Sequence, residues 1–342
     1  MLTDSFDDIT SVSHLFLCWE KFKVGKRKKE DVQLFERHLE DHLFELSAAL
    51  RGRAYSHGIY HRFQVFDPKK RLISKASVRD RLVHHLVYDE LVRIFDKTFI
   101  YHSFSCRVGK GTHQGVRSLE RALRKISSNG TKQAYVLKVD IHRFFDSICH
   151  PILKQIIRRS ITDPAMLNLI DIIIDSFCVG GKEEPCGLPL GNVTSQVFAN
   201  IYLHELDFFI KHRLKQSFYF RFCDDFCVVS QNLSHLEQLI APIQRFLKKR
   251  LLLDMHPKKT VVRKFSQGVD FLGYVLLPNY KVVRTQTKKR LKNRLNRTRK
   301  DFLSGRVDGH FLNQQLQSYL GLLTHANEYT FATALKNSCL SV

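Results

Sequence analysis

The chain has 342 residues, 44% of them hydrophobic, and its 55 Lys and Arg against 33 Asp and Glu give a formal net charge of +22. This composition excludes a disordered chain, and the length allows one large core or two to three subdomains. No apolar run reaches the ~20 residues that span a bilayer, the acidic N-terminus is unlike a signal peptide, and the eight cysteines form no paired Cys-x-x-Cys motifs. We therefore expect a cytoplasmic protein with neither a membrane span nor a zinc site.

The N-terminal region is predicted to be helical. After the polar segment 26–31, apolar residues recur at three- and four-residue steps, which predicts one helix with a single apolar stripe. The stripe consists of Val32, Phe35, Leu39, Leu43, Leu46 and Leu50. Gly52 and Gly58 end this helix, and a region of mixed pattern then runs to a loop at 127–130.

Two stretches in the middle of the chain place carboxylates at the ends of β-prone runs. The strand pattern 135–140 ends at Asp140, and a helix-like segment follows it. Asp224 and Asp225 lie between the strand patterns 218–222 and 226–229, which predicts a strand, a tight turn and a second strand. A solvated Asp-Asp turn beside an unrelated helix cap is the simpler interpretation of the same pattern.

If the two elements are neighbours in one sheet, three carboxylates converge. Asp140, Asp224 and Asp225 would repel one another without a counter-charge beside them, and hard divalent cations would hold them together. Two such ions about 4 Å apart clamp an in-line phosphoryl displacement. The pattern therefore indicates phosphoryl-transfer chemistry.

The C-terminal region is predicted to be a basic helix. A turn is expected at 278–279, and from residue 281 to residue 300 there are ten Lys and Arg and no Asp or Glu. Leu291, Leu295 and Phe302 give this helix a narrow apolar face. Such a surface needs an anionic partner, for which nucleic acid is the usual interpretation and an anionic membrane the competing one.

In order and spacing, the motifs resemble those of reverse transcriptases. The segment DIHRFFDSI at 140–148 resembles their first catalytic motif. The segment GLPLGNVTSQ at 187–196 resembles the loop and helix that hold the nascent base pair, and FCDD at 222–225 resembles the aromatic-x-Asp-Asp hairpin. The resemblance covers nearly the whole chain and includes these further segments: 71–74, 80–85, 106–113, 258–260, 271–274 and 318–327.

This resemblance implies a fold class and a division of the chain. The expected fold is an α+β right-hand polymerase with an antiparallel palm sheet and a helical thumb. N-terminal helices and fingers would occupy residues 1–130, the palm residues 131–280, and the basic thumb residues 281–342.

The resemblance also implies roles for single residues. The carboxylates of Asp140, Asp224 and Asp225, together with the backbone carbonyl of Ile141, would bind two Mg²⁺ ions, with Mn²⁺ as an alternative. The incoming deoxynucleotide would contact Lys70, Arg71, Phe145, Leu190, Gly191 and Lys259. Nucleic acid would contact Arg107, Lys110, Lys288, Arg290, Lys292, Arg294 and Arg297.

Several of these residues have a second, structural interpretation. Phe145 would either exclude a 2′-hydroxyl or pack in the core, and Lys259 would be either the general acid for pyrophosphate release or a surface lysine. Gly191 fits a place where a side chain would collide with the nucleotide, and Ser195 and Gln196 would contact the base pair or cap and pack the following helix.

The branch that the chain resembles most is bacterial. The segments 109–113 and 191–196 are similar to reverse transcriptases of diversity-generating retroelements, and Phe222-Cys223 is similar to some defence-associated members. The resemblance implies an RNA-directed DNA polymerase that uses a dedicated non-coding RNA in antiviral defence, with an accessory protein subunit or a homo-oligomer. The alternatives are a mutagenic retroelement enzyme, a polymerase that builds DNA without a template, and a catalytically inactive RNA-binding relic.

Overall fold

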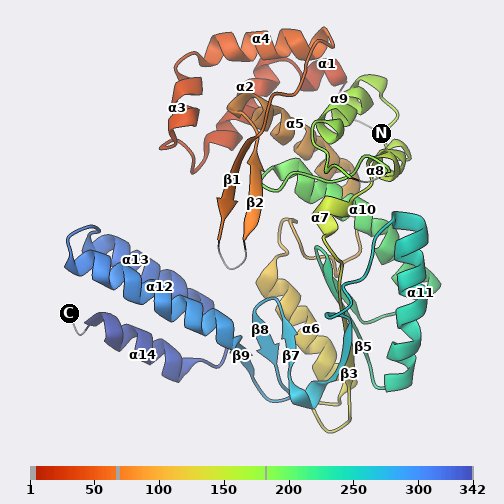
Figure 1. Ribbon diagram of the computed structural model, residues 1–342, viewed down its shortest axis with the longest axis vertical. Helices are drawn as coiled ribbons and strands as arrows, with labels where there is room; N and C mark the ends of the chain where they lie inside the picture. Colours follow the sequence, from red (N-terminus) through yellow and green to blue (C-terminus); the bar gives the residue numbers. More distant parts are fainter. Residues whose placement is uncertain (1–4, 67–69, 182, 341–342) are drawn as a thin grey trace. The chain divides into compact units, whose positions relative to one another are not determined.

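The computed structural model describes residues 5–66, 70–181 and 183–340, and its chain divides into two units (Figure 1). Unit 1 consists of Met1–Arg107, Asp140–Lys215 and Ala241–His256. Unit 2 consists of Val108–Val139, Gln216–Ile240 and Pro257–Val342. The chain passes between the units several times. The division into segments 1–130, 131–280 and 281–342 stays a prediction.

Unit 1 is mostly helical. Its elements are α1 (Phe6–Ile9), α2 (Val12–Lys23), α3 (Glu30–Glu36), α4 (Leu39–Arg51), α5 (Val78–Phe95), the 3-10 turn η1 (Asp96–Thr98), α7 (Phe144–Ser147), α8 (His150–Arg158), α9 (Pro164–Asp175), α10 (Val193–Phe208), the π-helical turn η2 (Phe209–Arg213), and the antiparallel strands β1 (His61–Val65) and β2 (Arg71–Lys75). The long helix α11 (Leu233–Leu251) begins in unit 2 and ends in unit 1.

The core of unit 1 forms around α5, which packs against α2 and α10. Its N-terminus is capped because the Ser77 hydroxyl accepts a hydrogen bond from the Asp80 amide. Buried His84 of α5 contacts the Thr194 hydroxyl of α10 through Nδ1 and the His57 ring through Nε2, 3.0 Å away. These contacts tie two long helices and the loop before β1 together.

The apolar stripe predicted as one helix is divided between two. α3 ends at Glu36 and α4 begins at Leu39, with His38 between them outside the helical region of backbone angles (φ −124°, ψ 41°). The single-helix prediction was therefore wrong. The apolar stripe faces the core, since Val32, Leu43, Leu46 and Leu50 are all buried. The periodicity therefore predicted which side chains are buried, but not the break between α3 and α4.

Unit 2 contains two antiparallel sheets. Strands β3 (Tyr135–Asp140), β4 (Tyr219–Phe222), β5 (Asp225–Ser230) and β6 (Val261–Lys264) form one sheet in the order β4-β5-β3-β6. The helix α6 (Thr112–Ile126) packs against β4 and β5. After the 3-10 turn η3 (Phe265–Gln267), strands β7 (Val269–Phe271), β8 (Tyr274–Leu276) and β9 (Lys281–Val283) form the second sheet.

The C-terminal part of unit 2 is a set of three helices, α12 (Thr285–Leu303), α13 (Gly309–Leu323) and α14 (Tyr329–Leu340), drawn in blue in Figure 1. The helix expected directly after the turn at 278–279 begins later, because residues 281–283 instead extend the sheet as β9. Leu291 and Leu295 are buried as predicted, while Phe302 is only half-buried.

Among residues 5–66, 70–181 and 183–340, no helix has the length and apolar character that crossing a membrane would require.

Candidate active site

The Asp224-Asp225 pair lies on a tight hairpin in unit 2. Phe222 of β4 pairs with Asp225 of β5, so Cys223 and Asp224 form a two-residue turn. The predicted strand, turn and strand are present, but Asp225, which was expected in the turn, begins β5. Cys223 has a φ of +54°, in the left-handed region that two-residue hairpin turns favour. Arg221, which is fully buried, donates a hydrogen bond to the Cys223 carbonyl at 3.2 Å. A buried guanidinium therefore fixes the turn that carries Asp224.

The strand that ends at Asp140 is the neighbour of the strand that starts at Asp225. The sheet order places β3 beside β5, which is the arrangement that the sequence analysis required. Lys138 of β3 lies with its Nζ 3.3 Å from Asp225 Oδ2. Alternate residues of a strand share a face, so Lys138 and Asp140 belong to the same face of β3.

The position of Lys138 differs from what was expected around the three carboxylates. The three carboxylates were expected to have no counter-charge beside them, whereas Asp225 is paired with this ammonium group. Burial lowers the pKa of Lys138, but the negative groups around it, Asp225 first among them, outweigh burial and hold the pKa above its ordinary value. Lys138 also donates to the Asp270 carbonyl at 2.9 Å, so it is held in place from two sides.

The backbone beyond β3 is fixed within unit 1. The Asp140 carbonyl accepts from the His256 amide and the His142 amide donates to the Asp254 carbonyl, both at 2.8 Å. Ile141, whose carbonyl is a predicted metal ligand, is buried and forms an isolated bridge with Met255. The segment 254–256 therefore holds the turn from β3 into α7.

The two phenylalanines after Asp140 have different environments. Phe144 is buried, whereas Phe145 is half-buried, and their rings meet edge to face with centroids 5.4 Å apart. The Phe145 carbonyl accepts from the Leu188 amide at 2.8 Å, which ties α7 to the loop that leads to Leu190. Phe144 is thus the core residue of the pair, and the sugar-contacting role of Phe145 stays a prediction.

The loop at Leu190 and Gly191 packs directly against β2. The Ser74 amide donates to the Leu190 carbonyl at 2.9 Å, and the buried Asn192 side chain donates to the Ser74 carbonyl at 2.8 Å and accepts from the Ala76 amide at 3.2 Å. Gly191 has a φ of +115°, and a Cβ there would lie 2.7 Å from Ile73 Cγ2. The approach of β2 is therefore one reason for a glycine at this position, and contact with a nucleotide stays a prediction.

The sequence left open whether Ser195 and Gln196 contact the base pair or pack the following helix, and in the structure the two side chains have different environments. The Ser195 hydroxyl donates to the Pro189 carbonyl at 2.7 Å and is buried, so it holds the loop to α10. Gln196 is exposed and faces a cavity.

This cavity in unit 1 has a volume of about 450 Å³ and lies beside Gly191. Its basic lining was not predicted: Lys26, Lys29, Lys75 and Arg81 all contribute. Asp31 lies within ion-pair distance of Lys75, at 2.6 Å, and also pairs with Arg81. These cations are spread over α5, β2 and the segment before α3, so no local sequence pattern could have grouped them.

Lys70 and Arg71, which were predicted to contact the phosphates of the nucleotide, lie at the N-terminal end of β2. Arg71 and Lys70 are exposed, and Arg71 pairs across the hairpin with Val65. Residues 67–69, including Lys69, lie outside the described part of the chain. In unit 2, Lys259 is half-buried, and its predicted role as a general acid is not decided by this position.

Arg107 does not fit the predicted contact with nucleic acid. Its guanidinium is bound to the Asp96 carboxylate, with Nε 2.6 Å from Oδ1, and donates to the carbonyls of Asp96, Ile100 and Ser103. The side chain is only 8% exposed. Arg107 instead anchors its own loop, whereas Lys110 three residues later is half-buried.

The basic helix α12 keeps most of its expected surface. Lys292, Arg294 and Arg297 are exposed, and Arg290 is half-buried. Lys288 differs, because its Nζ lies 2.6 Å from the nearly buried carboxylate of Glu328 and its charge is used to hold α12 near the start of α14. The exposed positions remain predicted contacts with nucleic acid.

The donor set at the end of β3 and in the hairpin consists of carboxylate oxygens, which suit Mg²⁺. Within the described ranges, no three His, Cys, Asp or Glu side chains form a ready-made metal cage. Magnesium sites that act on phosphates commonly use one or two carboxylates and complete the octahedron with water and phosphate oxygens. Asp224 and Asp225 on their fixed turn fit this kind of open site.

Residues 66–276 match the family model for Reverse transcriptase (RNA-dependent DNA polymerase). The chain belongs to this family. The matched region of the reverse transcriptase contains Asp140 and the hairpin with Asp224 and Asp225, and it ends before α12. The motif order that the sequence analysis relied on is therefore that of a true family member.

Two proteins similar to this reverse transcriptase are associated with introns. It is 32% identical over 152 residues to an uncharacterized 91 kDa protein in a cob intron of Schizosaccharomyces pombe, covering 44% of this chain and 18% of that protein. It is 23% identical over 328 residues to the group II intron-encoded protein LtrA of Lactococcus lactis subsp. cremoris, covering 77% of this chain and 51% of LtrA. The chain thus spans about half of LtrA and less of the fission yeast protein.

Among solved structures, a telomerase from Candida albicans in complex with a fragment of telomeric RNA matches with a TM-score of 0.52 at 12% identity, covering 84% of this chain and 58% of that chain. At this identity the likeness concerns the fold alone. It confirms the predicted α+β right-hand polymerase fold with antiparallel sheets.

Proposed function

We propose that this protein is an RNA-directed DNA polymerase whose catalytic carboxylates are Asp140, Asp224 and Asp225. The observation that carries the proposal is the strand order: β3, which ends at Asp140, adjoins β5, which starts at Asp225, in a member of the reverse transcriptase family. Adjacent strand ends are where a two-strand carboxylate site would form.

In this proposal the residues of the chain position the reacting groups. Asp140 and Asp224, with the Ile141 carbonyl and Asp225, would hold two Mg²⁺ ions, or Mn²⁺ in their place, and such ions would neutralise charge at the attacked phosphate. Lys138 restrains Asp225 through the 3.3 Å ion pair. Arg221 restrains the turn at Cys223. The carboxylates of Asp224 and Asp225 are therefore already held in position before the reaction begins.

Several residues would contact the incoming deoxynucleotide. Arg71 at the start of β2, Lys70 just before it, and the basic cavity of about 450 Å³ beside Gly191 offer cations to a triphosphate. Leu190 and Gly191 would lie against the nascent base pair. Phe145 would contact the sugar and Lys259 would donate a proton to the leaving pyrophosphate.

Primer extension tests the proposal. An RNA template with an annealed DNA primer, the four deoxynucleotides and Mg²⁺ should give extended DNA with the wild-type protein. Asp224→Asn and Asp140→Asn should each abolish extension while RNA binding is retained. Asp41→Asn, which removes an exposed carboxylate of α4, serves as the matched control and should extend normally.

We further propose that a dedicated structured RNA provides the template, the primer or both, and that the activity serves antiviral defence. The large positive charge, concentrated on α12, favours an RNA partner recognised by shape and backbone. The relatives' intron origin favours a retroelement context, so a mutagenic enzyme of a diversity-generating retroelement is the second candidate.

Crosslinking with sequencing of bound RNA, together with sequencing of DNA made before and during phage infection, separates these roles. Phage-dependent or repetitive DNA supports defence. Complementary DNA with errors concentrated at template adenines supports diversification. Recovery of random cellular RNA alone would contradict a dedicated RNA, and RNA binding without any DNA product would indicate an inactive relic.

A further inference from the structure

The outer side of α6 carries a row of arginines for which the proposed polymerase chemistry has no use. The buried side of this helix includes Val116, Leu119 and Leu123, whereas Arg117, Arg121 and Arg124 are exposed. Spacings of four and three residues keep the arginines on one side, roughly 6 and 4.5 Å apart along the axis. They form a short linear array of charge.

Acidic groups balance only part of this charge. A cavity of about 490 Å³ beside α6 is lined by Arg117, Arg121, Arg124 and Lys281, and by a single carboxylate, Glu120. That carboxylate is shared, because Lys281 lies 2.7 Å and Arg124 3.2 Å from its oxygens. Arg117 forms no ion pair with any residue that the structure describes, and Arg121 makes one long contact of 3.5 Å with the Ser118 hydroxyl. The array therefore has spare positive charge.

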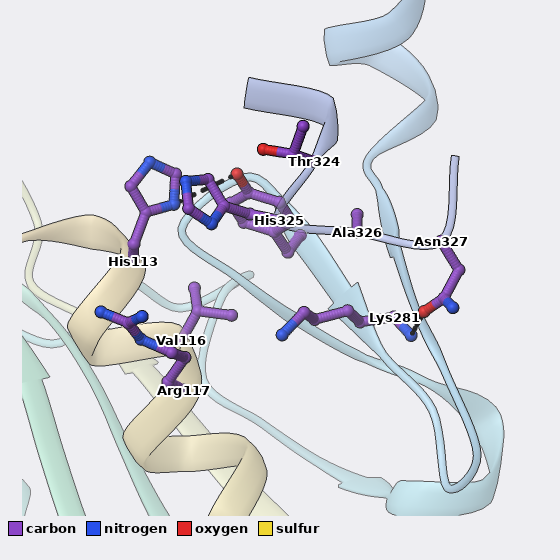
Figure 2. A pocket seen from close by; sticks show the side chains of 9 residues that line it. His113, Val116, Arg117, Lys281, Thr324, His325, Ala326 and Asn327 are labelled. Atoms are coloured by element: carbon purple, nitrogen blue, oxygen red, sulfur yellow. Dashed lines mark hydrogen bonds between the residues drawn. The ribbon is translucent and has the colours of Figure 1, made fainter. Parts of the chain in front are cut away.

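A second cavity continues from the first, since Arg117 and Lys281 line both. Its volume is about 270 Å³, and the rings of His113 and His325 lie against each other on one side, with centroids 3.8 Å apart. Figure 2 shows these two rings side by side, with Lys281 reaching in from β9. The Tyr274 hydroxyl lies 3.4 Å from His113 Nδ1 and donates to the Leu322 carbonyl at 3.2 Å.

The loop that brings His325 to this cavity is held in place. The Asn327 amide donates to the Lys281 carbonyl at 2.8 Å, and the Asn327 side chain accepts from the Lys281 amide at 3.1 Å. Burial, then His325, Arg117 and Lys281, lower the pKa of His113, which favours a neutral aromatic ring near pH 7. The cavity thus combines fixed cations with an aromatic surface, of which the His325 ring is exposed.

We propose that the α6 arginine row and the histidine cavity together form a binding surface for a single strand of nucleic acid. Phosphodiester groups would lie along Arg117, Arg121 and Lys281, and one base would stack on His325. Proteins that bind single strands combine a basic track for the backbone with aromatic rings for the bases. The surface is separate from α12 and from the carboxylate hairpin. It deepens the proposed polymerase function and rests on it for the class of ligand.

The first test measures binding of fluorescently labelled oligo(U) and oligo(dT) across salt concentrations, in EDTA and without nucleotides. Arg117→Gln with Arg121→Gln should lower the magnitude of the log–log salt slope by about 1.4, which is roughly 25-fold weaker binding at 0.1 M salt. The control variant, Arg263→Gln with Lys264→Gln, removes the same charge from exposed positions on β6. An unchanged slope in the arginine variant, or an equal loss in the control, would overturn the proposal.

The second test concerns the base. His325→Ala should weaken binding of a base-bearing strand by at least about fivefold and leave an abasic strand of equal length unaffected. Equal effects on both strands would contradict stacking at this ring. A larger loss for oligo(U) than for oligo(dT), or the reverse, identifies which strand the surface holds.

These results separate the surface from the catalytic proposal. If the wild-type protein extends primers but the arginine variant binds strands as before, the proposed binding surface is wrong and the proposed polymerase activity is retained. If the arginine variant loses binding while the wild type extends nothing, the surface stands and the polymerase proposal fails.

Discussion

At the scale of single residues, Gly191 is both closely packed against β2 and predicted to contact the nucleotide. Its backbone has a φ of +115°, and the space that a Cβ would need is occupied by Ile73 Cγ2 at 2.7 Å. The neighbouring Leu190 carbonyl and Asn192 side chain are bonded to β2, the strand that also carries Arg71. A change at Gly191 therefore acts on the fingers strand before it acts on any nucleotide.

Gly191→Ala should destabilise unit 1 by about 1–3 kcal/mol and reduce kcat/KM for the deoxynucleotide, because a positive φ and a clash with β2 add together. Gly181→Ala is the matched control, since Gly181 also has a positive φ (+85°) but no neighbour within 4 Å. Thermal unfolding and steady-state incorporation measure both effects. Equal behaviour of the two variants would mean that the contact with Ile73 is irrelevant.

Phe145→Ala should raise the use of ribonucleotides relative to deoxynucleotides by removing the half-buried ring expected against C2′ of the sugar. Phe145→Tyr keeps the ring and should retain discrimination. Side-by-side incorporation of paired ribo- and deoxynucleotides measures the ratio. If the ratio is the same for all three proteins, Phe145 is a packing residue only.

At the scale of elements, the contact between α5 and α10 depends on a neutral histidine. Burial, and then the neighbours His57 and His85, lower the pKa of His84 to about 3 from an ordinary value of 6.5. His84 is buried and its two ring nitrogens contact Thr194 and His57. The folded protein therefore takes up this proton at a much lower pH than the unfolded chain does.

Below pH 6.5 the unfolded chain binds more protons at His84, so the free energy of unfolding should fall as the pH falls towards 3, by up to about 1.4 kcal/mol per pH unit. His84→Gln should be less stable at pH 7 but should show a shallower loss in acid. Denaturant unfolding from pH 7 to pH 4 measures the slopes, with His310→Gln on the exposed face of α13 as the control. A slope in His84→Gln equal to that of the wild type would refute this assignment.

The exposed face of α12 should contribute to duplex binding without sequence preference. Changing Lys292, Arg294 and Arg297 to Gln should lower the magnitude of the salt slope for a primer–template duplex by about two to three, since each lost phosphate contact removes about 0.9. Lys288→Gln should instead lower stability, because Lys288 pairs with nearly buried Glu328. Salt titrations that show no change in the triple variant would place this face against solvent or another partner.

Elements set by local pattern could be predicted from the sequence, and elements set by packing could not. The hairpin at Asp224 was foreseen because two β-prone runs flank a two-residue turn. The added strand β9 and the anchored position of Arg107 depend on how the chain folds back on itself, since β9 pairs with β8, and Asp96, Ile100 and Ser103 surround the Arg107 guanidinium. The same holds for Lys138, whose pairing with Asp225 arises only when β3 and β5 become neighbours.

At the scale of the whole molecule, the family assignment rests on residues 66–276, and the proposed chemistry rests on three carboxylates in that region. The chain beyond residue 276 supplies β9, α12, α13 and α14, which form the basic surface and the histidine cavity of unit 2. A reverse transcriptase catalytic region is thus joined to a C-terminal part that we propose holds nucleic acid.

The most direct test of the proposed polymerase activity is incorporation of a single deoxynucleotide on an RNA template by wild type, Asp224→Asn and the control Asp41→Asn, with and without Mg²⁺. We expect primer extension by one nucleotide for wild type and the control in Mg²⁺, and none for Asp224→Asn or after chelation. Extension by Asp224→Asn at the wild-type rate, or extension by the wild type without any divalent cation, would contradict this expectation.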